Sequence, residues 1–556
     1  MKVYEAIAQS LREEGIDQFF GLMGDGNMWL WSTLARDNGV TITSARHEAA
    51  ALSMADGFSR TTGKVGVAMV TCGPGLTQVG TSLVVAARNR SQVVLIIGEI
   101  PQTTKYHVQW MDQRRWVEAN EALFHTITSA DTMAEEIAEA FYATRVHRRP
   151  VVLNLPMDLQ EKSFDWDYSY RPSTEFLPPV LSEPNQAALA QVADALAAAE
   201  RPVIIAGKGA RFAGAKSAIL QLAERTGALL ATSLQGKGMF AGEEWDVGIS
   251  GAFASVVTEE LLGEADFVLG VGAEVGYYTS EGGLMFPTAR VARIDIKPAP
   301  EAIGVLPGLH VQGDALKAVT ALNAMLEQRG IRKPGFRTAE TRAKLASPPK
   351  TFDRPNDGLD PRVLARELGR AIPKGAIVTC GAGHFFSWPA MYTSLPEGAE
   401  IQFSYQFGAV GQGLPLAIGV GVGNPGRPHI AIEGDGSLMM NMQELETVCR
   451  YRQQMVLIVW NDAGYGAEVH KLKAKGFEPA LAQWVSPDFV ALAKAFGGDG
   501  VKLERESDLP AAVATGLAKG SLYLIDARVS PSTPTDTYAK VHFGIPNAAP
   551  LLRPPA

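Results

Sequence analysis

The sequence predicts an α/β protein made of three doubly wound domains, each built on a parallel sheet. Apolar runs such as VGVAMVT and SQVVLIIG alternate with helical stretches such as EAIAQSLREEG, which is typical of a parallel sheet wrapped by helices. The chain has 556 residues, more than a single hydrophobic core usually serves. Two proline-containing stretches interrupt the alternation, RPSTEFLPPVLSEP and KLASPPKTFDRPNDG, and we expect them to be linkers.

These two linkers define three predicted domains. The first covers 1–170. The second covers 186–330, and its predicted strands include RPVIIAG, FVLGVGAE and VARIDIK. The third covers 358–535, where the strands AIVTCGAG, HIAIEGDG and MVLIVWND each run into a glycine-rich or acidic turn. Ligands of open α/β sheets bind at the carboxyl ends of strands, so we expect a ligand-binding site at these turns.

Composition excludes several classes of protein. The chain is 46% hydrophobic and 20% charged, as in a globular protein, and its net charge of −8 argues against a nucleic-acid or membrane-surface partner. Cys72, Cys380 and Cys449 are the only cysteines, with no CxxC pair, so neither a disulfide framework nor a cysteine zinc site is expected. With no secretory signal and no apolar run of about 20 residues, we expect a cytoplasmic protein.

The strongest chemical signal lies in the third domain. Asp435 ends the strand HIAIEGDG, and Asp462 ends the strand MVLIVWND. Between them, NMQELETVCRYR is interpreted as a crossover helix, which makes the two strands parallel and able to lie side by side. Two carboxylates then converge on one sheet edge, where Mg²⁺ and a phosphate can bind, and Gly436, Ser437 and Gly464 allow close approach of the backbone. An isolated GDG would indicate only a turn.

This segment resembles the diphosphate-binding signature of thiamine-diphosphate enzymes of the acetolactate synthase and pyruvate decarboxylase superfamily. The resemblance implies thiamine diphosphate and Mg²⁺ as cofactors. It implies that the metal ligands are the side chains of Asp435 and Asp462 and the main-chain carbonyl of Gly464. The family usually has Asn where this chain has Asp462. Further cofactor-binding positions implied by the resemblance are Gly383, His384, Gly408, Val410, Gly436, Ser437, Tyr465 and Gly466.

The first domain resembles the family's pyrimidine-binding domain through ARHEAAALSMADGFSRTTGKVGVAMVTCGPGLTQ. There Glu48 corresponds to the helix-borne glutamate that faces N1′ of the cofactor. An exposed glutamate is the ordinary alternative, because Glu is rarely buried without a partner. Apolar residues follow Glu48 directly, from Ala49 to Leu52, so we expect a desolvated carboxyl with a raised pKa.

SYQFGAVGQGLPLAIGVGVGNPG resembles the family's loop that holds the cofactor in a folded shape. Val410 occupies the position of the apolar wedge, and the carbonyl of Gly408 is placed to accept a hydrogen bond from the 4′-amino group. In TCGAGHFFSW, Gly383 and His384 match a Gln-His pair near the diphosphate. Core packing is the alternative interpretation for both Val410 and His384.

Candidates on the substrate side come from weaker matches. Asp25, in FFGLMGDGNMWL, is similar to a decarboxylase acid/base, and Glu468, in NDAGYGAEVHKL, lies where those decarboxylases carry a second catalytic acid. A loop cap or a surface charge is the alternative for each. The decarboxylases' His-His pair is absent, and the region reads KYHVQWMDQRR. Gln109 is the nearest match to a catalytic Gln of acetolactate synthases, with Gln113 as the other option.

The middle domain resembles the one that holds FAD in acetolactate synthases, but its glycines in IIAGKGARFAG are not spaced as GxGxxG. Where FAD-binding relatives have an Arg-Phe-Asp-Asp-Arg run, this chain has GAEVGYYTSEGG. We therefore do not expect FAD, and we expect this domain to be structural or to shape the substrate entrance.

The resemblance implies chemistry on a 2-oxo acid through a C2-carbanion and enamine intermediate. Capture by a second carbonyl compound makes the protein an acetolactate-synthase-like carboligase, the interpretation that chain length and domain order favour. The alternatives are a decarboxylase that releases an aldehyde, a lyase that cleaves a 2-hydroxy ketone or 2-hydroxyacyl thioester, and a catalytically inactive cofactor-binding paralogue. The family also implies a homodimer at least, and commonly a homotetramer, with each site shared between subunits.

Overall fold

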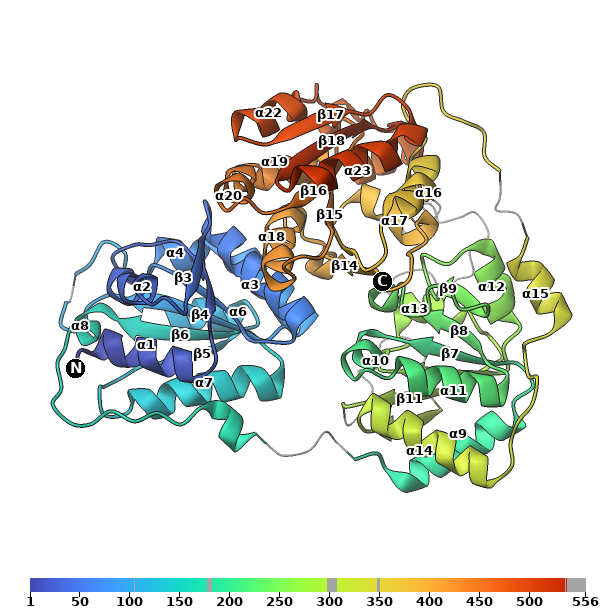
Figure 1. The fold of residues 1–556 in the computed structure, drawn as a ribbon, viewed down its shortest axis with the longest axis horizontal. Helices are drawn as coiled ribbons and strands as arrows, with labels where there is room; N and C mark the ends of the chain where they lie inside the picture. The colour runs from blue at the N-terminus through green and yellow to red at the C-terminus, as the bar shows by residue number, and fades with distance from the viewer. Residues whose placement is uncertain (105, 178–182, 298–307, 348–350, 536, 538–556) are drawn as a thin grey trace.

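The computed structural model describes residues 1–104, 106–177, 183–297, 308–347, 351–535 and 537. Within this part of the chain there are three six-stranded sheets, and every paired strand runs parallel to its neighbour. Helices cover both faces of each sheet, and the three sheets form three bodies that follow one another along the chain (Figure 1). The predicted fold class is therefore confirmed.

The first body has the strand order β2-β1-β3-β4-β6-β5. Most of its strands are buried on both faces, which explains why they read as continuous apolar runs. Its strands are β1 (Gln18–Gly21), β2 (Thr41–Ser44), β3 (Gly66–Val70), β4 (Val93–Glu99), β5 (Leu123–Thr126) and β6 (Val151–Pro156). Its helices are α1 (Val3–Glu13), α2 (Met28–Ala35), α3 (Glu48–Thr62), α4 (Pro74–Gln78), α5 (Gly80–Asn89), α6 (Gln113–Ala119), α7 (Met133–His147) and α8 (Met157–Gln160).

The central body has the order β12-β11-β10-β7-β8-β9. A short 3₁₀ helix, η1 (Ser173–Phe176), precedes it in the stretch expected to be a linker. Its strands are β7 (Pro202–Ala206), β8 (Leu229–Thr232), β9 (Asp246–Ile249), β10 (Phe267–Val271), β11 (Arg290–Asp295) and β12 (Leu309–Gln312). Its helices are α9 (Gln186–Ala198), α10 (Lys208–Phe212), α11 (Lys216–Thr226), η2 (Leu234–Gly236), α12 (Val256–Gly263), α13 (Tyr277–Ser280), η3 (Glu281–Gly283), α14 (Ala315–Gln328) and α15 (Ala339–Leu345).

The third body has the order β14-β13-β15-β16-β18-β17, the same succession as in the first body. Its strands are β13 (Ile377–Cys380), β14 (Glu400–Phe403), β15 (His429–Gly434), β16 (Met455–Asn461), β17 (Asp499–Lys502) and β18 (Leu522–Arg528). Its helices are α16 (Pro361–Ala371), η4 (His384–Phe386), α17 (Ser387–Tyr392), η5 (Gln406–Gly408), α18 (Gly413–Gly423), α19 (Asp435–Asn441), α20 (Glu444–Arg450), α21 (Gly466–Ala474), η6 (Ala480–Ala482), α22 (Phe489–Ala495), η7 (Glu506–Asp508) and α23 (Leu509–Lys519).

The predicted pairing at the centre of the third sheet is confirmed, and the predicted crossover helix is partly wrong. Strands β15 and β16 are adjacent and parallel, in a register that runs from Ile430 opposite Val456 to Gly434 opposite Trp460. The crossover contains two helices, α19 and α20, instead of one, and α19 begins at Asp435 itself. A carboxylate in the first turn of a helix is favoured by the helix dipole, so the GDG sequence starts a helix immediately after the strand.

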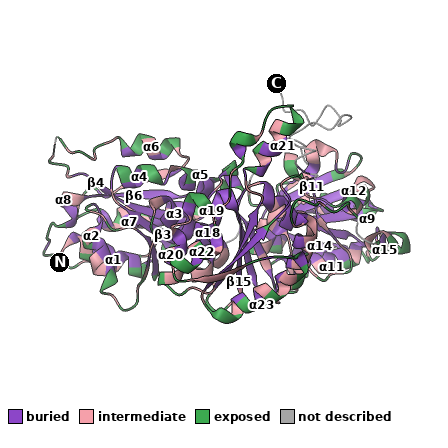
Figure 2. Ribbon diagram, turned by 90° about the horizontal axis from the view of Figure 1, so that it is seen from above, coloured by how far each residue is buried: buried purple, intermediate pink, exposed green. Residues whose placement is uncertain are grey.

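The first and third bodies share one hydrophobic core. Helix α3 packs against α18, and buried side chains from both bodies form a single cluster around this contact. The contact is close because both helices carry glycine there: a Cβ at Gly57 would lie 2.2 Å from the Leu416 carbonyl oxygen. Figure 2 shows α3 and α18 buried at the centre of the molecule. The two bodies are therefore held in a fixed relation by packing.

Candidate active site

The carboxyl edge of the third sheet opens into a cavity of about 730 Å³. Loops that follow four of its strands, β13 to β16, form one wall, and the carboxyl ends of central-body strands form the opposite wall. This is the place where doubly wound sheets bind ligands. Predicted site residues that line the cavity are Gly383, His384, Gly408, Val410, Asp435, Gly436, Ser437, Asp462, Gly464, Tyr465, Gly466 and Glu468.

Asp435 is buried, with 1% of its surface exposed, at the first position of α19. Its Oδ2 accepts hydrogen bonds from Trp484 Nε1 at 3.1 Å and from Ser486 Oγ at 3.4 Å. Ser486 Oγ also lies 2.7 Å from Oδ1 of Asn461, the last residue of β16. Burial and the neighbouring Asp462 carboxylate raise the pKa of Asp435 well above its ordinary value.

Asp462 directly follows β16, and its side chain is 12% exposed. Burial raises the pKa of this carboxyl also. The nearby imidazole does not neutralise it: His384 Nδ1 lies 3.9 Å from Asp462 Oδ2, and burial lowers the pKa of His384 to about 4, so the ring is uncharged at neutral pH. The two aspartates therefore form a buried acidic pair.

His384 is fixed in place by contacts on both sides. Its Nε2 accepts a hydrogen bond of 3.1 Å from the Thr535 backbone N–H. Its ring centroid lies 4.7 Å from that of His470, whose pKa is lowered to about 3 by burial and by the neighbouring His384. His384 is thus a buried histidine that also lines the cavity, and both interpretations of the sequence apply to it.

The donor set fits Mg²⁺ bound together with a phosphate. Among the described residues there is no cluster of three or more His, Cys, Asp or Glu side chains that could hold a metal alone. A cation at Asp435 and Asp462 therefore needs further oxygens from a carbonyl or a bound ligand, which is how Mg²⁺ is commonly held with phosphorylated ligands. A divalent cation would also offset the repulsion from Asp462 that, together with burial, raises the pKa of Asp435.

Two glycines leave room beside the acidic pair. A Cβ at Gly466 would lie 2.2 Å from Asp462 Oδ2, and a Cβ at Gly436 would lie 2.8 Å from the ring of Tyr465. Any larger residue would therefore displace a carboxylate or an aromatic wall. Ser437 lies in the first turn of α19. Its Oγ accepts a hydrogen bond from the Gly411 N–H at 3.0 Å and so joins this helix to the loop before α18. The observed cradle fits a phosphate group.

That loop carries the two other predicted cofactor positions. Gly408 and Val410 both line the cavity, and Val410 is only half-buried, so core packing does not account for it alone. The backbone is strained here, because Phe407 has a φ of 65° although it is not glycine. Such conformations persist where the surrounding structure imposes them, often at functional sites.

Three predicted residues of the first body lie at the carboxyl edge of its own sheet. Asp25 follows β1 and is exposed, Glu48 begins α3 after β2 and is half-buried, and Gln109 follows β4. None of the three lines the cavity of the third body within this chain. Within this chain the predicted residues therefore form two separate groups, one at the edge of the first sheet and one at the edge of the third.

The structure distinguishes Gln109 from Gln113. The Gln113 side chain is 3% exposed and fully engaged: Oε1 accepts from Gly73 N, and Nε2 reaches Gly98 O, Glu99 Oε2 and Asn154 Oδ1 within 3.1 Å. Gln109 remains half-buried, and its Oε1 lies 3.0 Å from Cys72 Sγ. Of the two, Gln109 is the side chain able to turn toward a ligand.

Glu468 lies on α21 at the cavity wall, with 56% of its side chain exposed and its carboxylate 4.0 Å from Lys471 Nζ. Tyr465 lines the same wall and stacks edge-on against Trp484, with ring centroids 4.8 Å apart. Trp484 and Ser486 were not predicted from the sequence. No motif marks them, and only the fold brings their loop onto Asp435.

Three family models match the chain in order. They are the thiamine pyrophosphate enzyme N-terminal TPP binding domain over residues 1–118, the central domain over 189–322 and the C-terminal TPP binding domain over 381–527. In the part of the chain that the structure describes, every helix is too short or too polar to cross a membrane.

Curated relatives match nearly the whole length. The acetolactate synthase large subunit of Haemophilus influenzae is 26% identical, over 95% of this chain and 94% of its own. The probable acetolactate synthase large subunit of Methanocaldococcus jannaschii is 28% identical, over 96% and 92%. A probable 2-ketoarginine decarboxylase of Pseudomonas aeruginosa is also 28% identical, over 94% and 93%. With three matching domains in the same order and a glycine-lined acidic cavity in the third, the chain belongs to the thiamine pyrophosphate enzymes.

Proposed function

We propose that the protein is a Mg²⁺-dependent, acetolactate-synthase-like carboligase, which joins a 2-oxo acid donor to a second carbonyl compound. One observation carries the proposal: Asp435 and Asp462 form a buried acidic pair beside Gly436 and Gly466, where a metal-bound diphosphate fits. Relatives named acetolactate synthase, aligned over nearly the full length, support carboligation as the reaction.

The metal ligands in this proposal are the carboxylates of Asp435 and Asp462 and the carbonyl of Gly464. Trp484 and Ser486 hold Asp435 Oδ2 by hydrogen bonds and so orient the carboxylate toward the cavity. The N-terminus of α19 adds its dipole, and the backbone of Gly436 and Ser437 can donate to a phosphate there. An aspartate in place of the amide usual in the family gives the site one more negative charge.

The remaining cofactor contacts follow the cavity wall. Gly383, His384, Tyr465 and Gly466 surround the diphosphate end, and Gly408 and Val410 meet the rings. When bound, thiamine diphosphate supplies a nucleophilic carbon and an electron sink for bonds next to a carbonyl. The protein's part is to place the rings and to exclude water.

Glu48 is proposed to act in the cavity of a partner subunit, by holding a proton at N1′ of the pyrimidine ring. It lies at the edge of the first sheet and does not line the cavity of its own chain, which supports a site shared between two copies. A homodimer is then the minimum active unit, and a homotetramer is the assembly we propose by family resemblance.

On the substrate side, Gln109 is proposed to orient the donor, and Asp25 and Glu468 are proposed to exchange protons with it. Asp25 and Gln109 share the edge that bears Glu48, so the same subunit would deliver all three. Glu468 lies in the cavity wall of the other subunit. We propose that the enzyme works without FAD and resides in the cytoplasm, where its three free cysteines stay reduced.

Decarboxylation with release of an aldehyde is the second candidate. It is favoured by the acidic Asp25 and Glu468, and by the relative named as a probable 2-ketoarginine decarboxylase. The two reactions differ in what adds to the fragment that remains from the 2-oxo acid donor: a proton gives an aldehyde, and a second carbonyl compound gives the carboligation product. Acid groups near the reacting centre favour the proton.

The test is product analysis with purified protein, thiamine diphosphate and Mg²⁺. Pyruvate alone, then pyruvate with an aldehyde, is expected to give 2-hydroxy ketone or acetolactate-type products. Glu48→Gln should lower the rate by at least about 100-fold, as for lost acid–base assistance. Glu118→Gln, an exposed residue of the first body, serves as the matched control. A Glu48→Gln protein as active as the parent would refute the assignment, and an aldehyde as sole product would establish decarboxylation.

A further inference from the structure

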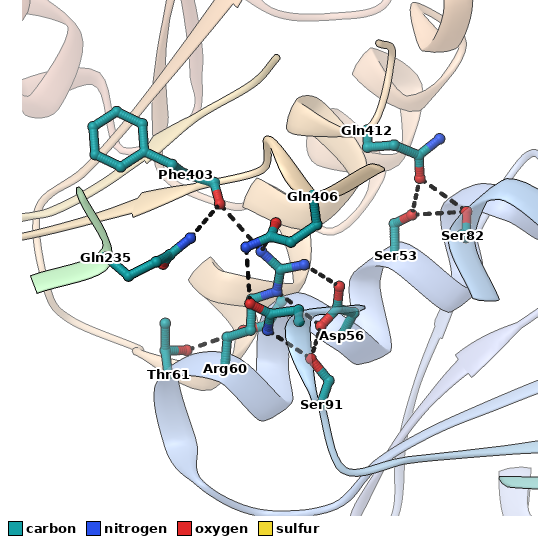
Figure 3. A network of polar contacts seen from close by, with 12 residues as sticks. Ser53, Asp56, Arg60, Thr61, Ser82, Ser91, Gln235, Phe403, Gln406 and Gln412 are labelled. Atoms are coloured by element: carbon teal, nitrogen blue, oxygen red, sulfur yellow. Dashed lines mark hydrogen bonds and ion pairs between the residues drawn. The ribbon is translucent and has the colours of Figure 1, made fainter. Parts of the chain in front are cut away.

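The loop that connects β14 to α18 is fastened to the first body at both of its ends. This loop, residues 404–412, contains the two proposed ring-binding positions, Gly408 and Val410. At both ends a side chain of α3, the helix that begins with Glu48, makes a contact, and α5 adds a further contact at each end. Figure 3 shows the α3 residues involved.

The first fastening point is a buried ion pair. Arg60 and Asp56, one helical turn apart on α3, lie 2.6 Å from each other with 2% of each side chain exposed. Arg60 Nη1 donates to the Phe403 carbonyl at 3.3 Å and to Gln406 Oε1 at 3.2 Å. Gln406 Nε2 in turn donates to Asn89 Oδ1 at 3.0 Å. A buried charge pair is costly unless its remaining hydrogen bonds are made, so loss of these contacts would be unfavourable.

The second fastening point is an amide held by two hydroxyls. Gln412 is 6% exposed, and its Oε1 accepts hydrogen bonds from Ser53 Oγ at 2.6 Å and from Ser82 Oγ at 2.9 Å (Figure 3). Gln412 directly precedes α18, whose first residue is Gly413. The loop between Gln406 and Gln412 therefore has both ends fixed to the first body.

The residues involved form one face of α3. Ser53, Asp56, Gly57 and Arg60 follow the i, i+3, i+4, i+7 spacing of a helix face. Gly57 lies between the two polar contacts and admits the backbone of α18 at Leu416. Glu48 lies at the beginning of the same helix, five positions before Ser53.

We propose that this face of α3 positions the cofactor loop of its own chain, with Ser53, Arg60, Gln406 and Gln412 as positioning residues. This inference rests on the proposed function, in which Glu48 acts in the partner's cavity. Each α3 then serves both sites of a dimer: its first residue completes one, and the two turns from Ser53 to Arg60 hold the ring-binding loop of the other.

The direct test is Gln412→Leu, measured as the Kd of thiamine diphosphate in the presence of Mg²⁺, by titration without substrate. We expect Kd to rise about tenfold, equivalent to about 1.4 kcal/mol. Ser53 and Ser82 keep the Ala49 carbonyl as an acceptor, so neither hydroxyl is left without a partner. At saturating cofactor, kcat should stay within about twofold of the parent. Gln412→Glu, which keeps an acceptor oxygen, should recover most of the affinity.

The matched control is Asn424→Leu. Asn424 Nδ2 donates to Thr61 Oγ1 at 2.9 Å, so this variant also removes a polar contact between α3 and the α18 segment, but at the far end from the loop. We expect a similar loss of thermal stability and an unchanged Kd. Equal Kd values for the parent and Gln412→Leu would overturn the proposal, as would equal losses for Gln412→Leu and the control. If Gln412→Leu does not fold, the Ser53→Ala, Ser82→Ala double variant replaces it.

Mixed dimers test the two-site role. Where one chain carries both Glu48→Gln and Gln412→Leu and the other is unchanged, the only working site has a loosened loop, so half-saturation should need about tenfold more cofactor. Where each chain carries one substitution, one site is intact and half-saturation should match the parent. The proposal would be contradicted by the reverse pattern, in which the doubly substituted chain leaves half-saturation unchanged and the singly substituted chains raise it. That result would show that each site takes Glu48 and the loop from the same chain. Activity of the Glu48→Gln homodimer tests the proposed function separately, because the Kd of Gln412→Leu does not depend on turnover.

Discussion

A single methyl group at the α3–α18 contact gives a sharp test of how the two bodies are joined. Gly419 lies on α18, and a Cβ there would be 1.8 Å from the Met54 carbonyl oxygen on α3. Restoring an ordinary contact distance requires the helices to separate by about 2 Å. Met54 itself is fully buried in the core that the two bodies share, so the separation loosens that core.

Two effects of Gly419→Ala oppose each other. Alanine favours the helix by about 1 kcal/mol relative to glycine. Overpacking of a close contact costs about 1–3 kcal/mol, and here the obstacle is backbone, which cannot rotate away. Partial loss of packing in the shared core adds a further cost of about 1–2 kcal/mol. The steric and packing costs exceed the gain in helix propensity, and we expect a net destabilisation of about 1–4 kcal/mol.

The assay is denaturant unfolding of the cofactor-free protein, followed by circular dichroism, together with titration of thiamine diphosphate. Gly263→Ala is the matched control, because Gly263 ends α12 and a Cβ there meets nothing within 4 Å. The control should be neutral or slightly stabilising, whereas Gly419→Ala should unfold at lower denaturant and bind cofactor less tightly. A Gly419→Ala protein at least as stable as the parent would show that propensity decides and that the contact is looser than described.

Three further predictions concern the acidic pair. The folded state raises the pKa values of Asp435 and Asp462, so the contribution of these two groups to folding stability is favourable at low pH and is lost as the pH rises through the raised values. Asp462→Asn should therefore raise the Tm of the metal-free protein more at pH 8 than at pH 5. Equal gains in Tm at the two pH values would contradict this. Gly436→Ala should raise the Kd of thiamine diphosphate at least about tenfold, because the added Cβ would lie 2.8 Å from the Tyr465 ring. Calorimetric titration measures this Kd, and an unchanged value would contradict the prediction. Trp484→Phe keeps the ring but removes the donor to Asp435, so Mg²⁺ binding should weaken by about three- to tenfold and should recover at higher pH; binding that is as tight as in the parent at every pH would contradict the orienting role.

Local patterns in the sequence were sufficient to predict the sheets and the edge of the third sheet that forms the cavity. Strands such as β15 and β16 are buried on both faces, so each is a continuous apolar run that ends where the chain leaves the core. Parallel strands joined by a helix point their carboxyl ends to the same side, which brings Asp435 and Asp462 together without any long-range information.

Contacts between distant segments could not be predicted in this way. Trp484 reaches Asp435 from a loop 49 residues further along the chain, with no periodic pattern around it. The choice between Gln109 and Gln113 depends on which amide is already hydrogen-bonded, and only the packed structure shows that Gln113 is. The buried pair of Asp56 and Arg60 looks in the sequence like an ordinary i, i+4 pair on an exposed helix.

The first and third sheets share one strand order, and this supports the proposed role of a single helix in two sites. In each sheet the second strand of the body lies at the edge and leads into a helix: β2 leads to α3, and β14 leads to α18. These two equivalent helices pack against each other, so the segment that precedes each one occupies the same place in its body. In the first body this place bears Glu48, and in the third it bears the loop with Gly408 and Val410. Within one chain the two segments lie at the edges of separate sheets, and the proposed site needs a second copy to bring them together. We therefore expect cofactor affinity and activity to fall together on dilution below the dimer's dissociation constant, and a fully active monomer would refute this arrangement.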